Sequence, residues 1–396
     1  MGARGNVPVF RRGGAMDAGG TFTAATATGP SRPRGPRAAR RLTLGVEEEF
    51  VLLGRADGAP ALRAPEVLAL LDGDPRVKHE LMRYQLETVT GVCESLEQVG
   101  EELTAMRLLA ARAAAEVGCH LAATGVAPRT PPGLPAVTPD PRYAVLVERS
   151  RPLAGSFGTC GCHVHVGMPS RELGVRILAR LRPHLATLLA VSANSPVQAD
   201  RDTGWASRRY RLWSRFPSAR PPGVWWSAAD YDAAVDRLLR TGRALDERGV
   251  YFHARLSPRY PTIELRVMDT CLSAADAVLV AGLARALVAL AIEDEERGLP
   301  LPAPRQHRVV RQLRAAARHG LGARALDPST GRPATHRRLL AALADRLPDP
   351  DPVARLLDRL ALHGTGADRQ RALLARAAGP ADFARLLAGE TVRQGR

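Results

Sequence analysis

The segment LTLGVEEEFVLL, which follows Arg41, constrains the fold of this chain more than any other part of the sequence. Its apolar residues flank an acidic centre over a short stretch, a pattern that favours a β-strand over a helix. Side chains alternate between the two faces of a strand, so Glu47 and Glu49 share one face and Glu48 takes the other. Two carboxylates on one face repel each other unless a positive group lies between them.

Two later segments repeat this arrangement of polar residues two positions apart. His163 and His165 share one face of GCHVHVG, and Glu264 and Arg266 share one face of TIELRV. Polar pairs on apolar strands are costly to bury, and a divalent cation would neutralise several carboxylates at once. Mg²⁺ prefers oxygen ligands, commonly carboxylates together with phosphate oxygens, so the pattern predicts a nucleotide site. The alternative is that each pair lies on the solvent side of an amphipathic strand, which three matching pairs disfavour.

The segment KHELMRYQLETVTGVCESLEQV supplies two further acidic candidates. Glu87 is a candidate member of the metal cluster. Glu80 is a weaker one, because seven residues separate the two and would give them opposite faces in one unbroken strand.

A zinc site is a second interpretation of the CGCHVH run. Cys160, Cys162, His163 and His165 are all ligand types that zinc accepts. Strand parity disfavours this interpretation, because the two cysteines would face away from the two histidines.

Arginine rather than lysine is expected to contact phosphate. The sequence has no G-x-x-x-x-G-K-[ST] motif, and Lys78, its only lysine, has no glycine-rich context. The segment ASRRYRLWSRFP instead holds Arg208, Arg209 and Arg211 among aromatic residues, where guanidinium groups can grip a carboxylate or phosphate through two hydrogen bonds. The alternative is a basic surface loop covered by aromatic side chains.

Charge and composition bear on partners and location. The formal charge is +16, but nearly all of it is arginine, which reflects coding bias as much as a nucleic-acid partner; a nucleic-acid-binding role stays a minor alternative. The sequence lacks an uncharged apolar run of 18 residues and a signal-peptide pattern, so we expect a cytoplasmic protein without membrane contact. Five cysteines, an odd number, are expected to be reduced thiols.

The composition predicts three parts. Residues 1–40 are rich in Gly, Ala, Thr, Pro and Arg without apolar periodicity and are expected to be a disordered extension. Residues 41–304 mix strands and helices in one catalytic α+β domain, and residues 305–396 are helical and packed on it. The expected strands are 42–53, 85–93, 120–125, 159–167, 250–256 and 262–268. The expected helices are 95–117, 171–192, 274–296, 306–319, 335–346, 352–362 and 367–388.

Several motifs, taken in order, resemble the glutamate-cysteine ligase type 2 family, from about Leu42 to near the C-terminus. They are GVEEEF (45–50), QLETVTGVCESL (85–96), GCHVHVG (161–167), SANSP (192–196), SRRYRLWSRFP (207–217), TIELRVMDT (262–270) and GTGADRQR (364–371). The resemblance implies carboxylate-amine ligases with weak glutamate-cysteine ligase activity. It also implies a fold similar to the glutamine synthetase catalytic domain: a curved, mostly antiparallel sheet whose concave face holds ATP and divalent metals, with helices packed outside.

The resemblance also implies roles for particular residues. The metal-binding set is Glu47, Glu49, Glu87, His163 and Glu264. Arg266 is expected to contact phosphate, and Arg209 to hold substrate or the transferring phosphoryl group. His165, Asn194, Arg211 and Glu80 are expected contacts of substrate or nucleotide. Arg208 departs from the family pattern, which has an aromatic residue at this position.

The implied reaction joins glutamate to cysteine, with ATP as co-substrate and Mg²⁺, or Mn²⁺, as the cofactor. It gives γ-glutamylcysteine, ADP and phosphate through an acyl phosphate. A ligase of the same fold acting on another carboxylate and amine is the closest alternative. Small molecules are the expected partners, and the sequence leaves the oligomeric state open.

Overall fold

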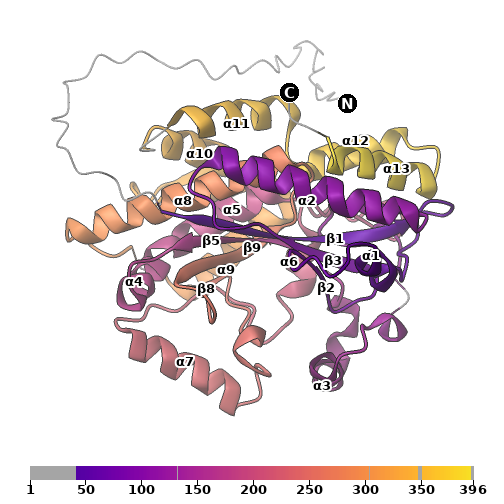
Figure 1. Ribbon diagram of the computed structural model, residues 1–396. Coiled ribbons are helices and arrows are strands. Elements are labelled where there is room, and N and C mark those ends of the chain that lie inside the picture. Colours follow the sequence, from indigo (N-terminus) through magenta and orange to yellow (C-terminus); the bar gives the residue numbers. More distant parts are fainter. Residues whose placement is uncertain (1–41, 132, 303, 347–349, 394–396) are drawn as a thin grey trace, which may run out of the picture. The chain divides into compact units, whose positions relative to one another are not determined.

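An antiparallel sheet runs through the centre of the structure (Figure 1). The computed structural model describes residues 42–393 except 132, 303 and 347–349, so the extension expected over residues 1–40 lies outside the described residues. In the described part of the chain the sheet has seven strands in the order β2-β3-β1-β5-β9-β8, and β4 pairs with β1. The strands are β1 (Leu44–Gly54), β2 (Val77–His79), β3 (Gln85–Val89), β4 (Cys119–Ala122), β5 (Gly161–Gly167), β8 (Ala254–Leu256) and β9 (Thr262–Asp269).

Long helices cover one face of this sheet (Figure 1). The helices α2 (Leu96–Glu116) and α8 (Ala274–Glu296) pack against each other and on β1 and β5, and α5 (Leu185–Ser192) packs on β9. α2 begins where the sequence indicates, because Ser95 and Gln98 form a reciprocal capping box. The arrangement confirms the predicted α+β class, a mostly antiparallel sheet with helices packed on one side.

Strand alternation decides which residues enter the core beneath these helices. On β1 the even-numbered residues, such as Val46 and Phe50, are fully buried against the helix layer. Cys162 and Val164 occupy the corresponding positions on β5. The odd-numbered residues of both strands therefore lie on the opposite face, where the polar pairs were expected.

α8 is a core helix although its composition resembles that of a membrane span. It is long and apolar enough to cross a membrane, but 67% of its most apolar window is buried inside the protein. It contacts α2, α4 (Arg171–Leu181), α5 and β5. Its apolar character is thus explained by packing on all sides.

Three sequence predictions need correction. The helix predicted over 171–192 is split into α4 and α5 by a 3₁₀ turn at Arg182–His184, because Pro183 cannot donate the helical hydrogen bond. The region after 304 is not wholly helical: β10 (Arg324–Leu326) and β11 (Pro333–Thr335) form a hairpin. The helix predicted over 367–388 is likewise two helices, separated at Gly379.

The remaining elements complete the layers. Late helices pack behind the sheet, α9 on α5 and α11 on α8, while α3 and α7 lie on the side of the sheet away from α10 to α13 (Figure 1). They are α1 (Ala64–Leu70), α3 (Pro141–Arg149), α6 (Arg208–Trp213), α7 (Ala228–Arg240), α9 (Gln306–His319), α10 (His336–Ala344), α11 (Pro350–His363), α12 (Gly366–Arg376), α13 (Pro380–Thr391), β6 (Val197–Gln198) and β7 (Arg201–Asp202).

Candidate active site

The face of the sheet that the long helices leave uncovered forms one wall of a cavity of about 610 Å³. Nine of the eleven residues predicted to serve the site line it: Glu47, Glu49, Glu80, Glu87, His163, His165, Arg209, Glu264 and Arg266. They come from β1, β3, β5, β9, α6 and the loop after β2. Asn194 and Arg211 do not line it.

The pairing of the strands brings the polar residues into rows. Glu49 lies opposite Glu87 on β3, and Glu47 lies opposite His163 on β5. His165 lies in turn opposite Glu264 on β9. Because directly paired side chains on one face are close neighbours, the strand register assembles the cluster.

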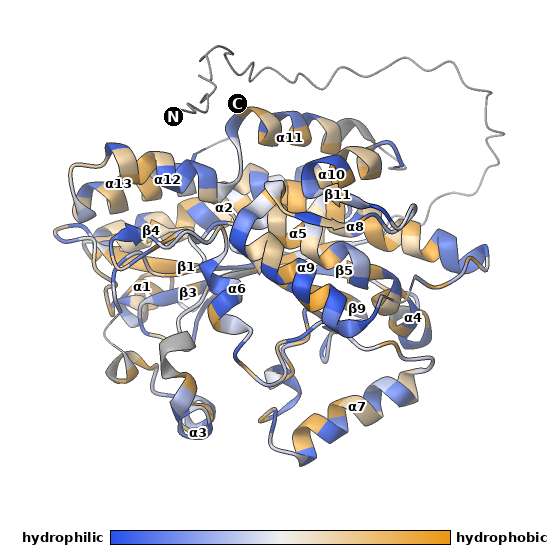
Figure 2. Ribbon diagram, turned by 180° about the vertical axis from the view of Figure 1, so that it is seen from behind, coloured by the Kyte–Doolittle hydropathy of each residue, from blue (hydrophilic) through white to orange (hydrophobic). Residues whose placement is uncertain are grey.

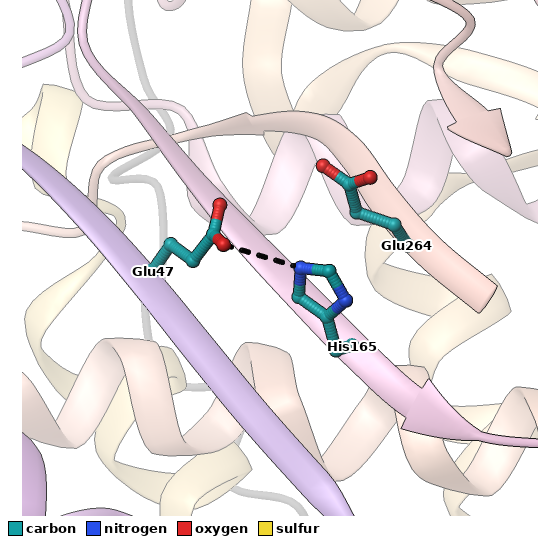
Figure 3. Close-up of side chains that lie close together, drawn as sticks. All are labelled: Glu47, His165 and Glu264. Carbon is teal, nitrogen blue, oxygen red and sulfur yellow. Dashed lines mark ion pairs between the residues drawn. The ribbon is translucent and has the colours of Figure 1, made fainter. Parts of the chain in front are cut away.

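Two groups of three side chains in this cluster are close enough to hold cations. Glu47, His165 and Glu264 form one group (Figure 3), and Glu47, Glu87 and His163 form the other. In each group the candidate ligand atoms lie within 4.8 Å of one another. Glu47 belongs to both, so its two oxygens could serve neighbouring positions.

The donor chemistry of these groups fits a divalent cation. Carboxylate oxygens dominate, as Mg²⁺ requires, and the imidazoles add nitrogen donors that Mn²⁺ accepts as well. The buried His165 Nε2 has no hydrogen-bond partner among the described residues and lies 3.5 Å from Glu47 Oε1. His165 Nδ1 is held by Thr262 Oγ1 at 2.9 Å, which fixes the ring with Nε2 toward the carboxylates.

The protonation states of His163 and Glu47 favour ligation of a cation. Burial, and next the charge of Arg266, lower the pKa of His163 to about 4, so its imidazole is neutral at pH 7. Burial would raise the pKa of Glu47, but the hydrogen bond with His163 and the close approach of the His165 ring bring it well below its usual range. A neutral imidazole beside an ionised carboxylate is the state that binds a cation.

The pKa values of Glu49 and Glu87, which lie opposite each other on β1 and β3, are shifted upward instead. Burial raises the pKa of Glu49 to about 8, and the charge of Glu80 acts in the same direction. Burial and then the charge of Glu47 raise the pKa of Glu87 well above its usual range. Several carboxylates crowded together in a buried place cannot all ionise without added positive charge.

Glu264 is held differently from the other carboxylates. Arg255 donates to it from the neighbouring strand β8, with Nε 2.6 Å from Oε2, and Arg266 donates to it from two residues along β9. Burial would raise its pKa, but the charges of Arg266 and Arg255 keep the pKa far below its usual range. Glu264 is therefore a permanently ionised group with a fixed orientation, and it holds Arg266 at the cavity wall.

Arg209 reaches the cavity from α6 through a buried network. Its Nη1 and Nη2 donate to the carbonyls of Val267 and Arg266, both at 3.3 Å, and its guanidinium lies 4.9 Å from the Trp213 ring centroid. Its Nε is buried without a partner in the described part of the protein. The side chain is 2% exposed, and burial lowers its pKa. A guanidinium with spare donors in a cavity is suited to an anionic ligand.

The start of α6 is anchored so that Arg209 points inward. Asp269, at the end of β9, accepts hydrogen bonds from Ser195 Oγ at 2.6 Å and Ser207 Oγ at 2.7 Å. Ser195 Oγ accepts from the backbone N–H of Arg209, and Ser207 is the N-cap of the helix. The SANSP and SRRYRLW motifs are thus joined through one buried carboxylate.

Asn194 and Arg211, in contrast, lie away from the cavity. Asn194 is fully buried, and its amide nitrogen donates to the carbonyls of Ala123 and Thr270. Its amide oxygen accepts from Gln370 on α12, so this side chain ties segments together. Arg211 is exposed on the outer side of α6.

A comparison with protein families places the chain. The model for glutamate-cysteine ligase family 2 matches residues 43–391. The protein belongs to this family. A relative from Frankia alni, provisionally named glutamate–cysteine ligase 2-2, is 42% identical over 379 residues, which cover 88% of this chain and 97% of the relative. The family match supports a carboxylate-amine ligase, an enzyme that forms an amide bond.

Solved structures support the fold. A bifunctional glutathione synthetase from Pasteurella multocida has a TM-score of 0.63 at 16% identity, covering 89% of this chain and 52% of the other. A glutamate–cysteine ligase from Francisella tularensis, solved in complex with AMP, has a TM-score of 0.61 at 13% identity, covering 88% of this chain and 89% of the other. The family member described here therefore shares with these ligases a fold built on a mostly antiparallel sheet with packed helices.

Sequence reasoning missed several residues that line the cavity of this family member. The polar-pair pattern does not identify Arg255, although this residue lies on a predicted strand with alternating polarity. Basic and aromatic side chains from β2, α3 and the segments around β8 also line the cavity: Lys78, Arg142, Tyr143, Arg248, Tyr251, Arg259 and Tyr260. Their place at the cavity becomes visible only when these segments are folded over the sheet.

The cysteines give the zinc interpretation no support. Cys162 lies in the core beneath the helices, and Cys160 contacts Gln85 Nε2 through its sulfur at 3.1 Å. Neither belongs to the two groups of potential metal ligands found among the described residues.

Proposed function

We propose that this protein is an ATP-dependent ligase that joins the side-chain carboxylate of glutamate to the amine of cysteine. The observation that carries the proposal is the convergence of five predicted glutamates, two histidines and the arginines Arg209 and Arg266 on one cavity. Family membership supports the ligase class, and the fold supports a nucleotide on the concave sheet face. The cytoplasm, where ATP and both amino acids occur, is the proposed location.

The chemistry requires activation of a poor electrophile. A carboxylate delocalises its charge, so one of its oxygens must become a leaving group before an amine can displace it. We infer that a glutamate carboxylate oxygen attacks the γ-phosphorus of ATP, forming an acyl phosphate and releasing ADP. The cysteine nitrogen then attacks the acyl carbon, the C–O bond breaks, and phosphate leaves while the amine loses a proton.

The acidic cluster would hold Mg²⁺, with Mn²⁺ as an alternative. A bound Mg²⁺ offsets negative charge on the β- and γ-phosphates and on the transferring group. The ligands would come from two groups: Glu47 with Glu87 and His163, and Glu47 with His165 and Glu264. Glu49 and Glu80 complete the acidic wall.

The arginines act on the phosphate itself. Arg266 is fixed by Glu264, and Arg209 is fixed by backbone carbonyls and the Trp213 ring, so both are held before a ligand arrives. Preorganised positive charge stabilises the transferring phosphoryl group without rearrangement during the reaction. Trp213 and Phe216, in the segment 205–226, line the cavity and would exclude water from the acyl phosphate.

Phosphate release from ATP in the presence of Mg²⁺ tests the proposal, screened over single amino acids and pairs with mass detection of the amide. Glutamate plus cysteine should give γ-glutamylcysteine, and chelation of the metal should abolish it. Formation of product only from another pair would keep the ligase class and change the substrates. If no amino acid or pair of amino acids stimulates ATP turnover, the proposed ligase activity is wrong.

A pair of variants tests the roles given to residues. Glu47→Gln keeps the shape but loses the charge, and turnover should fall about 100-fold or more with the fold unchanged. Glu97→Gln, on the exposed side of α2, is the matched control and should behave as wild type. Wild-type turnover in Glu47→Gln would contradict the role assigned to the cluster.

A further inference from the structure

A second cavity lies between α7, the segment 220–225 and the first residue of α9, and it shares no lining residue with the catalytic cavity. Its volume of about 790 Å³ falls within the range of small-molecule sites. Its lining residues are Arg220, Pro221, Gly223, Trp225, Ala233, Ala234, Arg237, Leu238, Arg240, Thr241, Arg243, Phe252 and Gln306.

Four arginines surround this cavity without any acidic residue among the lining. Arg237 and Arg240 lie three positions apart on α7 and so face the same way, and Arg243 follows in the turn. Within the described residues, none of the four has an ion pair with a carboxylate. Burial lowers the pKa of Arg220, and the charges of Arg243 and then Arg237 lower it further.

The aspartates of α7 do not balance this charge. Asp230 caps the start of the helix, and Asp232 pairs with Arg171 on α4. Asp236 is exposed, does not line the cavity and, among the described residues, forms no ion pair with any of the four arginines. α7 therefore carries acidic residues outside the cavity and basic residues toward it, with hydrophilic and hydrophobic positions interspersed along its length (Figure 2).

The floor of the cavity is apolar and aromatic. The rings of Trp225 and Phe252 have centroids 5.4 Å apart, and the Arg220 guanidinium lies 5.7 Å from the centroid of Phe252. Ala233 and Ala234 on α7 leave the space between helix and floor open. A planar group can rest on such a floor while charged groups reach the arginines.

Hydrogen bonds hold the loop that carries Arg220 and Trp225 in place. Arg182, which is 4% exposed, donates to the Pro222 carbonyl at 2.6 Å. Gln306 donates to the Pro221 carbonyl, and the backbone N–H of His253 donates to the Arg220 carbonyl. The cavity is thus a preformed feature, which lowers the ordering entropy that a ligand must overcome.

We propose that this second cavity binds a small molecule carrying two or more phosphate groups, separately from the substrates of the catalytic cavity. Guanidinium groups bind phosphate through paired hydrogen bonds, and four of them without counter-charges favour a multiply charged anion over a single carboxylate. Free polyphosphate and a nucleoside polyphosphate share this chemistry, and the aromatic floor would add affinity for a base.

The two cavities share a wall. Tyr251 lines the catalytic cavity, and the next residue, Phe252, lines the second one. His253 follows and stacks on Trp213 at 5.1 Å between centroids; Trp213 in turn packs on Arg209. A polyphosphate added to the protein could therefore bind in either cavity, and the test must distinguish binding in the second cavity from binding in the catalytic one.

Calorimetric titration with tripolyphosphate in the presence of a chelator measures binding directly. The wild type should bind, and Arg237→Gln/Arg240→Gln should bind on the order of tenfold more weakly or worse. Arg337→Gln/Arg338→Gln removes the same charge from exposed positions on α10 and should bind as wild type. Equal melting temperatures of both double variants would exclude a folding defect.

Equal affinity in the two double variants, or no binding to the wild type, would overturn the proposal. Binding of citrate without binding of tripolyphosphate would also overturn it, since the phosphate assignment would be wrong. Comparison of pyrophosphate with ADP identifies the source. Equal affinities would show that the phosphates alone are recognised, and tighter binding of ADP that is lost in Trp225→Ala would show a nucleotide site.

Discussion

Replacement of Arg107 by leucine should cost more stability than any single change on the protein surface. Arg107 is 1% exposed and holds the fully buried Glu48 through Nε at 2.9 Å and Nη2 at 2.5 Å. It also donates to the carbonyls of three residues that precede α8 or end α13, which are Cys271, Leu272 and Thr391. Without the guanidinium, one buried carboxylate and three buried carbonyls lose their partner.

The magnitude follows from the buried charge. Removing one member of a buried ion pair costs about 3–5 kcal/mol, and domains as a whole are stable by about 5–15 kcal/mol. We expect Arg107→Leu to lower the free energy of unfolding by about 4 kcal/mol, seen as a lower urea midpoint at unchanged slope. Glu48→Leu/Arg107→Leu should recover about 2 kcal/mol or more, because it removes the uncompensated charge but leaves the carbonyls.

An exposed pair provides the control for this experiment. Arg171 and Asp232 lie 2.5 Å apart with side chains 54% and 53% exposed, so Arg171→Leu should cost less than about 1 kcal/mol. A loss below about 1 kcal/mol in Arg107→Leu would refute the argument. So would a double variant no more stable than the single one.

Two further predictions concern a buried histidine and a glycine. His336 is fully buried, and burial lowers its pKa to about 4. Between pH 6.5 and pH 4 the unfolded chain therefore binds this proton and the folded chain does not, so the free energy of unfolding decreases as the pH is lowered. The stability lost between pH 6.5 and pH 5 should be about 2 kcal/mol smaller in His336→Gln, whereas His319→Gln, at an exposed position, should leave the pH dependence unchanged. Gly161→Ala would place a Cβ 2.3 Å from Arg209 Nη2, so ligase turnover should fall at least about tenfold while Gly91→Ala, with open space around it, stays at the wild-type rate. Unchanged turnover in Gly161→Ala would show that the position of Arg209 does not matter.

Strand alternation explains why much of the site could be predicted from sequence. Side chains alternate between the two faces of a strand, so a correct strand assignment is enough to place Glu47 and Glu49 on one face and Glu48 on the other. The neighbouring strands need not be known. The structure places the first two on the cavity wall and the third in the core with Arg107. The same rule separated the cysteines of CGCHVH from its histidines.

Where the strands end, parity no longer applies. In one unbroken strand Glu80 and Glu87 would point to opposite faces. β2 and β3 are separate strands with a loop between them, however, and both residues reach the cavity. Asn194 lies in a motif of the family, yet its amide joins three segments of the chain from a buried position. A family motif indicates that a residue type is required at a position. Only the packing in the structure shows whether that residue serves the chemistry or holds the fold together.

The acidic wall of the cavity works against the stability of the fold. Burial and mutual repulsion raise the pKa values of Glu49, Glu80 and Glu87, so ionising them at neutral pH destabilises the folded chain. A hydrophobic replacement would remove that penalty, although at Glu49 it would also remove the hydrogen bond from the backbone N–H of Gly161. The buried pair of Glu48 and Arg107 supports β1 directly behind this wall, which keeps its register fixed despite the repulsion. A binding site for cations and phosphate is expected to be locally unfavourable for folding and to be supported by the structure around it. The acidic wall in front of β1 and the ion pair behind it fit this expectation and the ligase proposed here.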